Sequence, residues 1–324
     1  MINSLHTMSI KFPYKEQSLI IIAVVLLVLF FVFFLMHLLI RKLRQNQVSY
    51  RKSAYFALMV ALGLTMVGLG AQTLYQNNTW SVQTKVLKPI QSYERQKSNR
   101  AASTDTTSRA DIAKMVMRQA VSGLEKQGFV SIPSQNILLP IYNDAYSDKG
   151  LNAGADYANK SEFDPSGDKK PVMGQGNYGI AAHNFNDGQT GFSSLQQETN
   201  HDFPYLNQGQ LKGSNWLNGQ TVLLANAQGI YDYRITGQTL VAPETVSVLN
   251  PTDDTKVTII SCLFPSTNYR IITHATLKRT YTWDNAPQHL AREFNLKVKN
   301  TNAHASWWNP GIEEGANGDK GGTK

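Results

Sequence analysis

The chain has 324 residues, of which 42% are hydrophobic and 10% aromatic, and a formal net charge of +8. This length and composition suffice for a sizeable core, so a globular part is expected. Five of the positive charges lie within residues 41–53, and no basic stripe is interleaved with aromatic residues. The charge therefore does not indicate a nucleic-acid partner.

Two apolar segments near the N-terminus predict membrane-spanning helices. Residues 19–40 contain one ionisable group, His37, and as a helix rising about 1.5 Å per residue they would reach about 33 Å, enough to cross a hydrocarbon core of about 30 Å. Residues 54–75 repeat the pattern more weakly, with small residues that would let another helix approach: Ala57, Ala61, Gly63, Gly68 and Gly70. We expect a transmembrane hairpin over residues 18–75, after an N-terminal tail of residues 1–17.

The charge of the connecting loop predicts the orientation of this hairpin. Residues 41–53 hold five basic side chains, whereas the N-terminal tail holds Lys11 and Lys15. By the positive-inside rule the loop is cytoplasmic, and the chain after Tyr75 lies outside the cell membrane. A signal peptide is the alternative for the first span, but its apolar stretch is longer than usual and residues 41–47 offer no small-residue cleavage site.

The exported part begins with a polar stretch, residues 76–109, which we interpret as a stalk. Residues 110–128 place Ile112, Met115, Val116 and Ala120 near helical spacing, which predicts one helix at the start of a folded domain over residues 110–284. Eight short β-type runs follow, which predict a mostly β fold closed into an eight-stranded barrel: residues 128–132, 137–142, 178–185, 220–225, 229–237, 239–249, 256–262 and 269–277. Residues 285–324 have little to bury, and we expect a partly disordered C-terminal tail.

The single cysteine, Cys262, ends the β-type run 257–262. Such a thiol is either an inert buried group or a reactive one, and a reactive thiol needs a basic neighbour. His201, His289 and His304 lie in polar or terminal segments, which leaves His183 and His274 as candidates; spacing alone favours His183 only modestly. Arg270 lies eight residues after the cysteine; it is either a solvated strand charge or a donor to an oxyanion.

Four segments resemble sortases, the membrane-anchored cysteine transpeptidases of Gram-positive bacteria, most closely the class A type. They are GFVSIPSQNILLPIY (residues 128–142), GNYGIAAHNF (176–185), YDYRITGQTLVAPETVSVL (231–249) and TIISC (258–262) followed by the arginine. The resemblance covers roughly residues 110–282. It implies Cys262 as nucleophile, His183 as the proton-transferring partner and Arg270 as the group that binds substrate backbone and stabilises the oxyanion.

The same resemblance implies a substrate and an acceptor. Similar enzymes cleave an LPxTG-type sorting signal of surface proteins between Thr and Gly, hold the acyl group as a thioester and transfer it to an amine of a lipid-linked peptidoglycan precursor. Two alternatives remain, a cysteine endopeptidase that releases such peptides to water and a catalytically degenerate binding module. No cofactor is predicted; some class A relatives bind calcium, and Glu244, Asp253 and Asp254 lie in the corresponding loop, but we predict no metal site there.

Overall fold

The structure is a computed structural model that describes residues 15–43, 50–76, 78, single positions between residues 85 and 101, 104–305 and 307–322. The chain divides into a hairpin unit within residues 9–79 and a larger unit from residue 80 onward. Nearly all of the predicted N-terminal tail (1–17) and most of the predicted stalk (76–109) lie outside the described residues, so those boundaries stay predictions.

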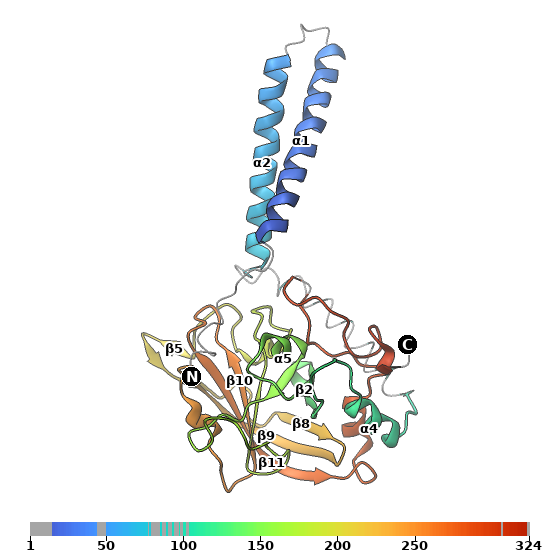
Figure 1. The fold of residues 1–324 in the computed structure, drawn as a ribbon, viewed down its shortest axis with the longest axis vertical. Coiled ribbons are helices and arrows are strands. Elements are labelled where there is room, and N and C mark those ends of the chain that lie inside the picture. Colours follow the sequence, from blue (N-terminus) through green and yellow to red (C-terminus); the bar gives the residue numbers. More distant parts are fainter. Residues whose placement is uncertain are drawn as a thin grey trace. The chain divides into compact units, whose positions relative to one another are not determined.

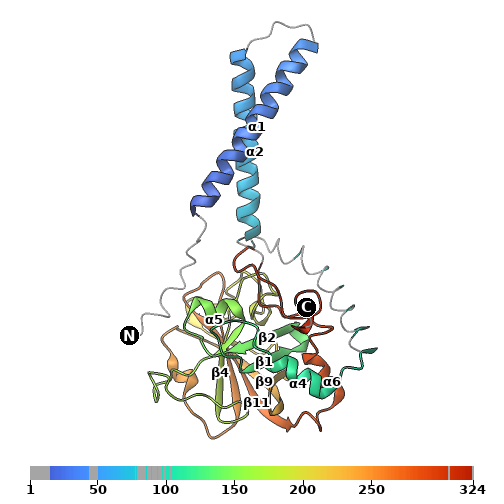
Figure 2. The ribbon, with the colours of Figure 1, turned by 45° about the vertical axis from the view of Figure 1, so that its right-hand side comes forward.

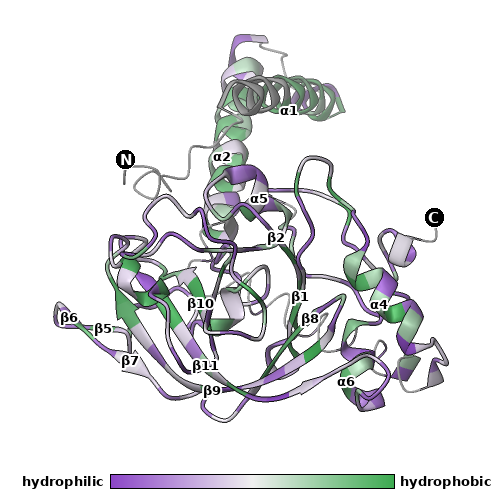
Figure 3. Ribbon diagram, turned by 60° about the horizontal axis from the view of Figure 1, so that its bottom comes forward, coloured by the Kyte–Doolittle hydropathy of each residue, from purple (hydrophilic) through white to green (hydrophobic). Residues whose placement is uncertain are grey.

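The hairpin unit consists of α1 (Lys15–Leu43) and α2 (Tyr50–Gln76), drawn in blue in Figure 1. Val25–Leu43 and Tyr50–Tyr75 are long and apolar enough to cross a membrane. Hydrophobic colouring dominates α1 in Figure 3. Both helices extend into residues 41–53, so the connecting segment is shorter than the predicted loop.

The contact between the two helices uses only some of the small residues that the sequence suggested. Ala57 and Ala61 are fully buried. A methyl group added at Gly63, Gly68 or Gly70 would meet no atom within 4 Å. The alanines therefore form the close approach within this hairpin, and the three glycines take no part in it.

The larger unit is built on a closed barrel of eight strands, as predicted (Figures 1 and 2). The strands are hydrogen-bonded in the order β11-β10-β4-β3-β2-β1-β8-β9, and β9 pairs with β11 to close the barrel. The strands are β1 (Gly128–Ile132), β2 (Ile137–Tyr142), β3 (Ala155–Tyr157), β4 (Asn177–Ala181), β8 (Thr221–Asn226), β9 (Gly229–Val241), β10 (Lys256–Cys262) and β11 (Arg270–Tyr281). The pairs β4–β10 and β2–β3 are parallel, and the other pairs are antiparallel.

Seven of the eight predicted runs are barrel strands, and one is not. Within residues 239–249, β9 continues to Val241 and the chain then forms a 3-10 helix, η4 (Val246–Leu249). The eighth strand is β3, whose three residues give no readable run. Short strands β5 (Leu206–Asn207) and β6 (Gln210–Leu211) form a separate ribbon, and β7 (Gly213–Ser214) pairs with β9.

Alternate residues of the strands pack on opposite sides of the barrel wall. On β1, Val130 and Ile132 belong to the interior core, whereas Phe129 packs outside with α4 (Arg109–Met117). The Ser108 hydroxyl caps α4 by accepting from the amide of Asp111 at 3.1 Å. The helix ends earlier than expected. Figure 2 shows α4 beside α6 (Gln288–Ala291), and together they cover this outer face.

The described part of the tail, residues 285–305 and 307–322, follows a definite path over the barrel, which differs from the expected partial disorder. Short 3-10 helices form at η5 (Arg292–Phe294) and η6 (Lys320–Gly322), and Phe294 and Leu296 are fully buried. Later in the tail, Glu314 is buried against Lys126, with Nζ–O distances of 2.8 and 3.0 Å. Polar pairing of this kind leaves no apolar periodicity in the sequence.

Candidate active site

Cys262 and His183 occupy equivalent positions at one end of the barrel. Strands β4 and β10 are parallel neighbours, and their last registered pair is Ala181 with Ile260. His183 and Cys262 each lie two residues beyond that pair. Because parallel strands that end together present their following residues at the same edge, the fold brings these two residues to one location.

Arg270 is brought to the same edge from the other side of β10. It is the first residue of β11 and lies directly opposite Cys262 in the antiparallel register. Its side chain is buried, and Nη1 donates to the carbonyls of Thr267 at 2.9 Å and Tyr269 at 3.0 Å. These bonds hold the guanidinium next to the cysteine strand.

The rival histidine, His274, lies farther along the same strand pair. It is opposite Thr258, four residues before Cys262, which corresponds to about 13 Å along a strand. Its Nε2 is 3.1 Å from the Thr239 hydroxyl. The register therefore keeps His274 away from the cysteine, whereas His183 follows the end of β4, the strand parallel to the cysteine strand. His201, His289 and His304 lie outside these strands.

A buried amide network joins the loop after His183 to the loop after Cys262. Asn184 Nδ2 donates to the carbonyl of Cys262 at 2.8 Å and to Gln196 Oε1 at 2.8 Å. Gln196 in turn accepts from the amide of Phe264 at 2.9 Å and donates to its carbonyl at 2.5 Å. Buried, satisfied networks of this kind rigidify a site.

Burial favours the uncharged forms of the Cys262 thiol and the His183 imidazole. Desolvation raises the pKa of the Cys262 thiol, and the nearby Arg270 charge opposes this only in part. Desolvation lowers the pKa of His183 to about 4, against an opposing effect of the Asp148 carboxylate. At neutral pH the pair is therefore mainly thiol and neutral imidazole, and the thiolate–imidazolium pair is the minor form.

Within residues 25–43, 50–76 and the described parts of 104–322, no group of three or more His, Cys, Asp or Glu side chains is arranged to hold a metal ion. Glu244, Asp253 and Asp254, the carboxylates near the calcium-binding loop of some relatives, are exposed to solvent.

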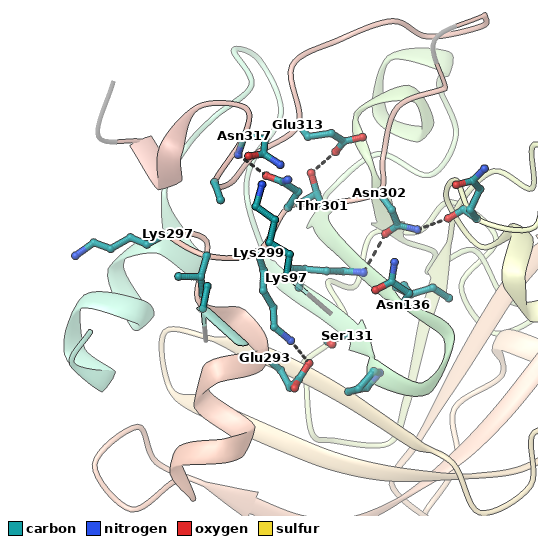
Figure 4. Close-up of a pocket in the computed structure, with 18 of the residues that line it drawn as sticks. Lys97, Ser131, Asn136, Glu293, Lys297, Lys299, Thr301, Asn302, Glu313 and Asn317 are labelled. Carbon is teal, nitrogen blue, oxygen red and sulfur yellow. Dashed lines mark hydrogen bonds and ion pairs between the residues drawn. The ribbon is translucent and has the colours of Figure 1, made fainter. Parts of the chain in front are cut away.

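A cavity of about 490 Å³ lies elsewhere, between the tail and the β1–β2 side of the barrel (Figure 4). Ser131 and Asn136 line it from the barrel, and Lys299, Thr301 and Asn302 from the tail. Its lining includes none of Cys262, His183 and Arg270.

Sequence reasoning missed the amides that support the site. His183 Nε2 lies 3.1 Å from Asn152 Oδ1, on α5 (Asp148–Ala153), and Asn184 and Gln196 join the two loops. Isolated asparagine and glutamine residues carry no pattern of their own in the sequence. Only the three-dimensional contacts identify them.

Comparison with known proteins finds similarity to sortases. Residues 130–278 match the family model of the sortase domain. Sortase A of Streptococcus agalactiae serotype III (strain NEM316) is 28% identical over 176 residues, covering 54% of this chain and 62% of the relative. Sortase A of Bacillus anthracis is 26% identical over 136 residues, covering 42% of this chain and 51% of the relative. The matches thus span between half and two thirds of the length of these relatives.

Solved structures with similar folds include sortase A of Listeria monocytogenes, with a TM-score of 0.40 and 22% identity, covering 52% of this chain and 96% of that one. Another is sortase C-3 of Streptococcus pneumoniae, with a TM-score of 0.39 and 19% identity, covering 65% of this chain and 94% of that one. The family-model match includes His183, Cys262 and Arg270. Residues 130–278 of this chain are therefore similar to the sortase domain.

Proposed function

We propose that this protein is a membrane-anchored, class A type cysteine transpeptidase that cleaves an LPxTG-type sorting signal between Thr and Gly. The observation that supports the proposal is the strand register: Cys262 is the registered partner of Arg270, and Cys262 and His183 each follow the last registered pair of β10 and β4 by two residues. A nucleophilic thiol needs a proton acceptor and a donor to the oxyanion, and these two neighbours supply both functions.

In the first half of the reaction, the Cys262 thiol transfers its proton to His183 and the thiolate attacks the threonine carbonyl carbon. The carbonyl π-bond electrons move to oxygen, and the Arg270 guanidinium stabilises that oxyanion. When the oxyanion collapses, the C–N bond breaks and the protonated His183 gives its proton to the leaving glycine amine. The product is a thioester between Cys262 and threonine.

In the second half, an amine replaces the thiol. His183 accepts a proton from the incoming amine, the nitrogen attacks the thioester carbonyl, and the C–S bond breaks as the thiolate leaves. The thiol regains its proton from His183. Atoms balance: one peptide bond is exchanged for another amide, without an external oxidant, reductant or metal.

The setting of this chemistry follows from α1 and α2. Two helices able to cross a membrane precede the domain, and the basic residues between the spans favour a cytoplasmic loop. We accordingly place the domain outside the cell membrane, where surface proteins and a lipid-linked peptidoglycan precursor would be the acyl donor and the amine acceptor.

The test uses the full chain in detergent micelles with a fluorescent LPxTG peptide, with and without a glycine-based amine, and mass spectrometry of the products. We expect the threonine acyl group on the amine, and we expect Cys262→Ala to form no product. Cleavage that never incorporates the amine would instead support a cysteine endopeptidase. If the wild type binds the peptide as the Cys262→Ala variant does and cleaves none of it, the degenerate binding module would be supported.

A further inference from the structure

The C-terminal tail reaches the candidate active site although it lies outside the family match. The match ends at residue 278, whereas Asn302 and Asn309 of the tail contact the loop and the helix that surround His183. The tail is fixed farther on by Glu314, which pairs with the buried Lys126 and accepts from the Tyr142 hydroxyl at 3.1 Å. It is therefore an integral layer of this domain.

One tail residue, Asn302, holds the loop that follows His183 (Figure 4). Its side chain donates to the carbonyls of Gln189 at 2.7 Å and Gly191 at 3.0 Å, and its own carbonyl accepts from the amide of Gly191 at 2.7 Å. On its other side it exchanges two hydrogen bonds with Leu138 of β2, at 2.9 and 3.1 Å. Asn302 thus joins the loop to the barrel wall.

A second tail residue, Asn309, holds the partner of the imidazole. Its Nδ2 donates to the carbonyl of Asn152 at 2.8 Å and to the carbonyl of Ala303 at 3.0 Å, and its Oδ1 accepts from the amide of Ala305 at 2.8 Å. Asn309 is buried. Through it the tail fixes the backbone of the residue whose side-chain oxygen contacts His183.

The third contact is aromatic. The rings of His183 and Phe185 meet edge to face with centroids 5.2 Å apart, and Trp307 packs on Phe185 in the same manner at 6.2 Å. This arrangement restricts rotation of the imidazole about its own side-chain bonds.

The contact with Asn152 decides which nitrogen of the imidazole carries hydrogen. An amide oxygen can only accept, so Nε2, 3.1 Å from Oδ1, is the protonated nitrogen of neutral His183. The lone pair is then on Nδ1. A histidine in the opposite tautomer would lose this bond and would present a hydrogen, rather than a lone pair, at Nδ1.

We infer that Asn152 is a positioning residue that selects the Nε2–H tautomer of His183, and that the tail residues Asn302, Trp307 and Asn309 hold Asn152 and the histidine loop in place for that purpose. Nδ1 is then the atom that takes the proton of the Cys262 thiol and later returns it to the leaving amine. This inference rests on the proposed function for its role in the reaction, but the tautomer itself exists without substrate.

The experiment measures the tautomer directly. Full-length protein in detergent, with ¹⁵N-labelled histidine, gives distinct nitrogen shifts for the two tautomers, and the His183 signals are assigned by their loss in His183→Gln. We expect Nε2–H in the wild type. We expect Asn152→Leu and Asn309→Ala to give a mixture, with a 10-fold or greater fall in kcat and a KM within about two-fold. Asn152→Asp keeps the acceptor and should keep the tautomer.

Ile312→Ser is the matched control, because Ile312 lies in the same tail with 74% of its surface exposed. It should change neither the tautomer nor the rate. A wild-type tautomer in both Asn152→Leu and Asn309→Ala, or Nδ1–H in the wild type, would overturn the inference. If Asn309→Ala does not fold, Asn152→Leu alone decides. Because the tautomer is read without substrate, failure of the peptide assay would reject the proposed function and leave this result standing.

Discussion

Arg270 and Cys262 face each other as the terminal registered pair of β10 and β11. Antiparallel partners have Cα atoms about 4.5–5.5 Å apart, so the guanidinium is constrained to the vicinity of the thiol by the ladder itself. Among the described residues, Arg270 donates hydrogen bonds through Nη1 alone, to the carbonyls of Thr267 and Tyr269. The remaining donors of the fork are those that the proposed reaction would use at the oxyanion.

The first prediction concerns this arginine. Because its charge lowers the pKa of Cys262 against the effect of burial, Arg270→Ala should raise the thiol pKa further, and loss of the oxyanion donor should lower kcat/KM by about 10²- to 10³-fold. Iodoacetamide alkylation against pH measures the first effect at one site, since the chain has a single cysteine. Arg279→Ala, on the exposed part of β11, is the control. An unchanged alkylation profile would contradict the assignment.

The second prediction concerns pH. With the pKa of His183 at about 4 and that of Cys262 raised, the thiolate–imidazolium fraction is small but constant between the two values. At a pH below the His183 pKa this fraction decreases because the thiolate is protonated. At a pH above the Cys262 pKa it decreases because the imidazolium loses its proton. The acid limb of kcat/KM should therefore lie near pH 4 and not near the ordinary histidine value of about 6.5. Rates measured from pH 3.5 to 10 on protein shown to be folded decide this.

The barrel could be predicted because seven of its strands are apolar runs bounded by turn residues. β3 escaped prediction because its three residues, Ala155–Tyr157, are too few to show a period, and residues 239–249 looked continuous although Pro243 precedes a 3-10 helix. Cys262, His183 and Arg270 were identified from the chemistry that a reactive thiol needs and from the resemblance to sortases. The amides Asn152, Asn302 and Asn309 could not be found, because their role depends on contacts between residues 31 to 157 positions apart in the sequence.

The third prediction tests the turn that supports the histidine. Gly191 has a φ of +61°, and an added Cβ would lie 2.3 Å from the carbonyl oxygen of His183. Gly209 has a similar φ of +79° with nothing within 4 Å. Gly209→Ala should cost about 1 kcal/mol in the free energy of unfolding, and Gly191→Ala about 1–3 kcal/mol more, with reduced activity. Equal melting temperatures and rates for the two variants would show that the close approach is unimportant.

The fourth prediction concerns the anchor of the tail. Lys126 and Glu314 are both buried, so Glu314→Gln leaves an ammonium group without its counter-charge and should destabilise the domain by about 3–5 kcal/mol. Glu125→Gln breaks the exposed pair with Lys170 and should cost less than about 1 kcal/mol. Urea unfolding followed by tryptophan fluorescence compares them. Similar midpoints for both variants would mean that the buried pair does not anchor the tail.

The fifth prediction uses a buried carboxyl beside β4. Asp156 is fully buried; its Oδ1 accepts from the amide of Asp144 at 3.0 Å, while Oδ2 has no hydrogen-bond partner among the described residues. Burial raises its pKa to about 7, and the Asp144 carboxylate adds to the effect. The folded state therefore holds a proton that the unfolded state releases near pH 4, and the free energy of unfolding falls as pH rises from about 4 to 7.

Asp156→Asn keeps the acceptor for the Asp144 amide and removes the titration. Relative to the wild type, its free energy of unfolding should increase between pH 4 and pH 8 by on the order of 2–4 kcal/mol, since each unit of pKa shift is worth about 1.4 kcal/mol. Asp168→Asn, at an exposed loop position, should show no such trend. Urea unfolding at pH 4, 6 and 8 gives the three differences. A constant difference across this range would mean that Asp156 is ionised in the folded domain at its ordinary pKa, and that its buried oxygen finds compensation elsewhere.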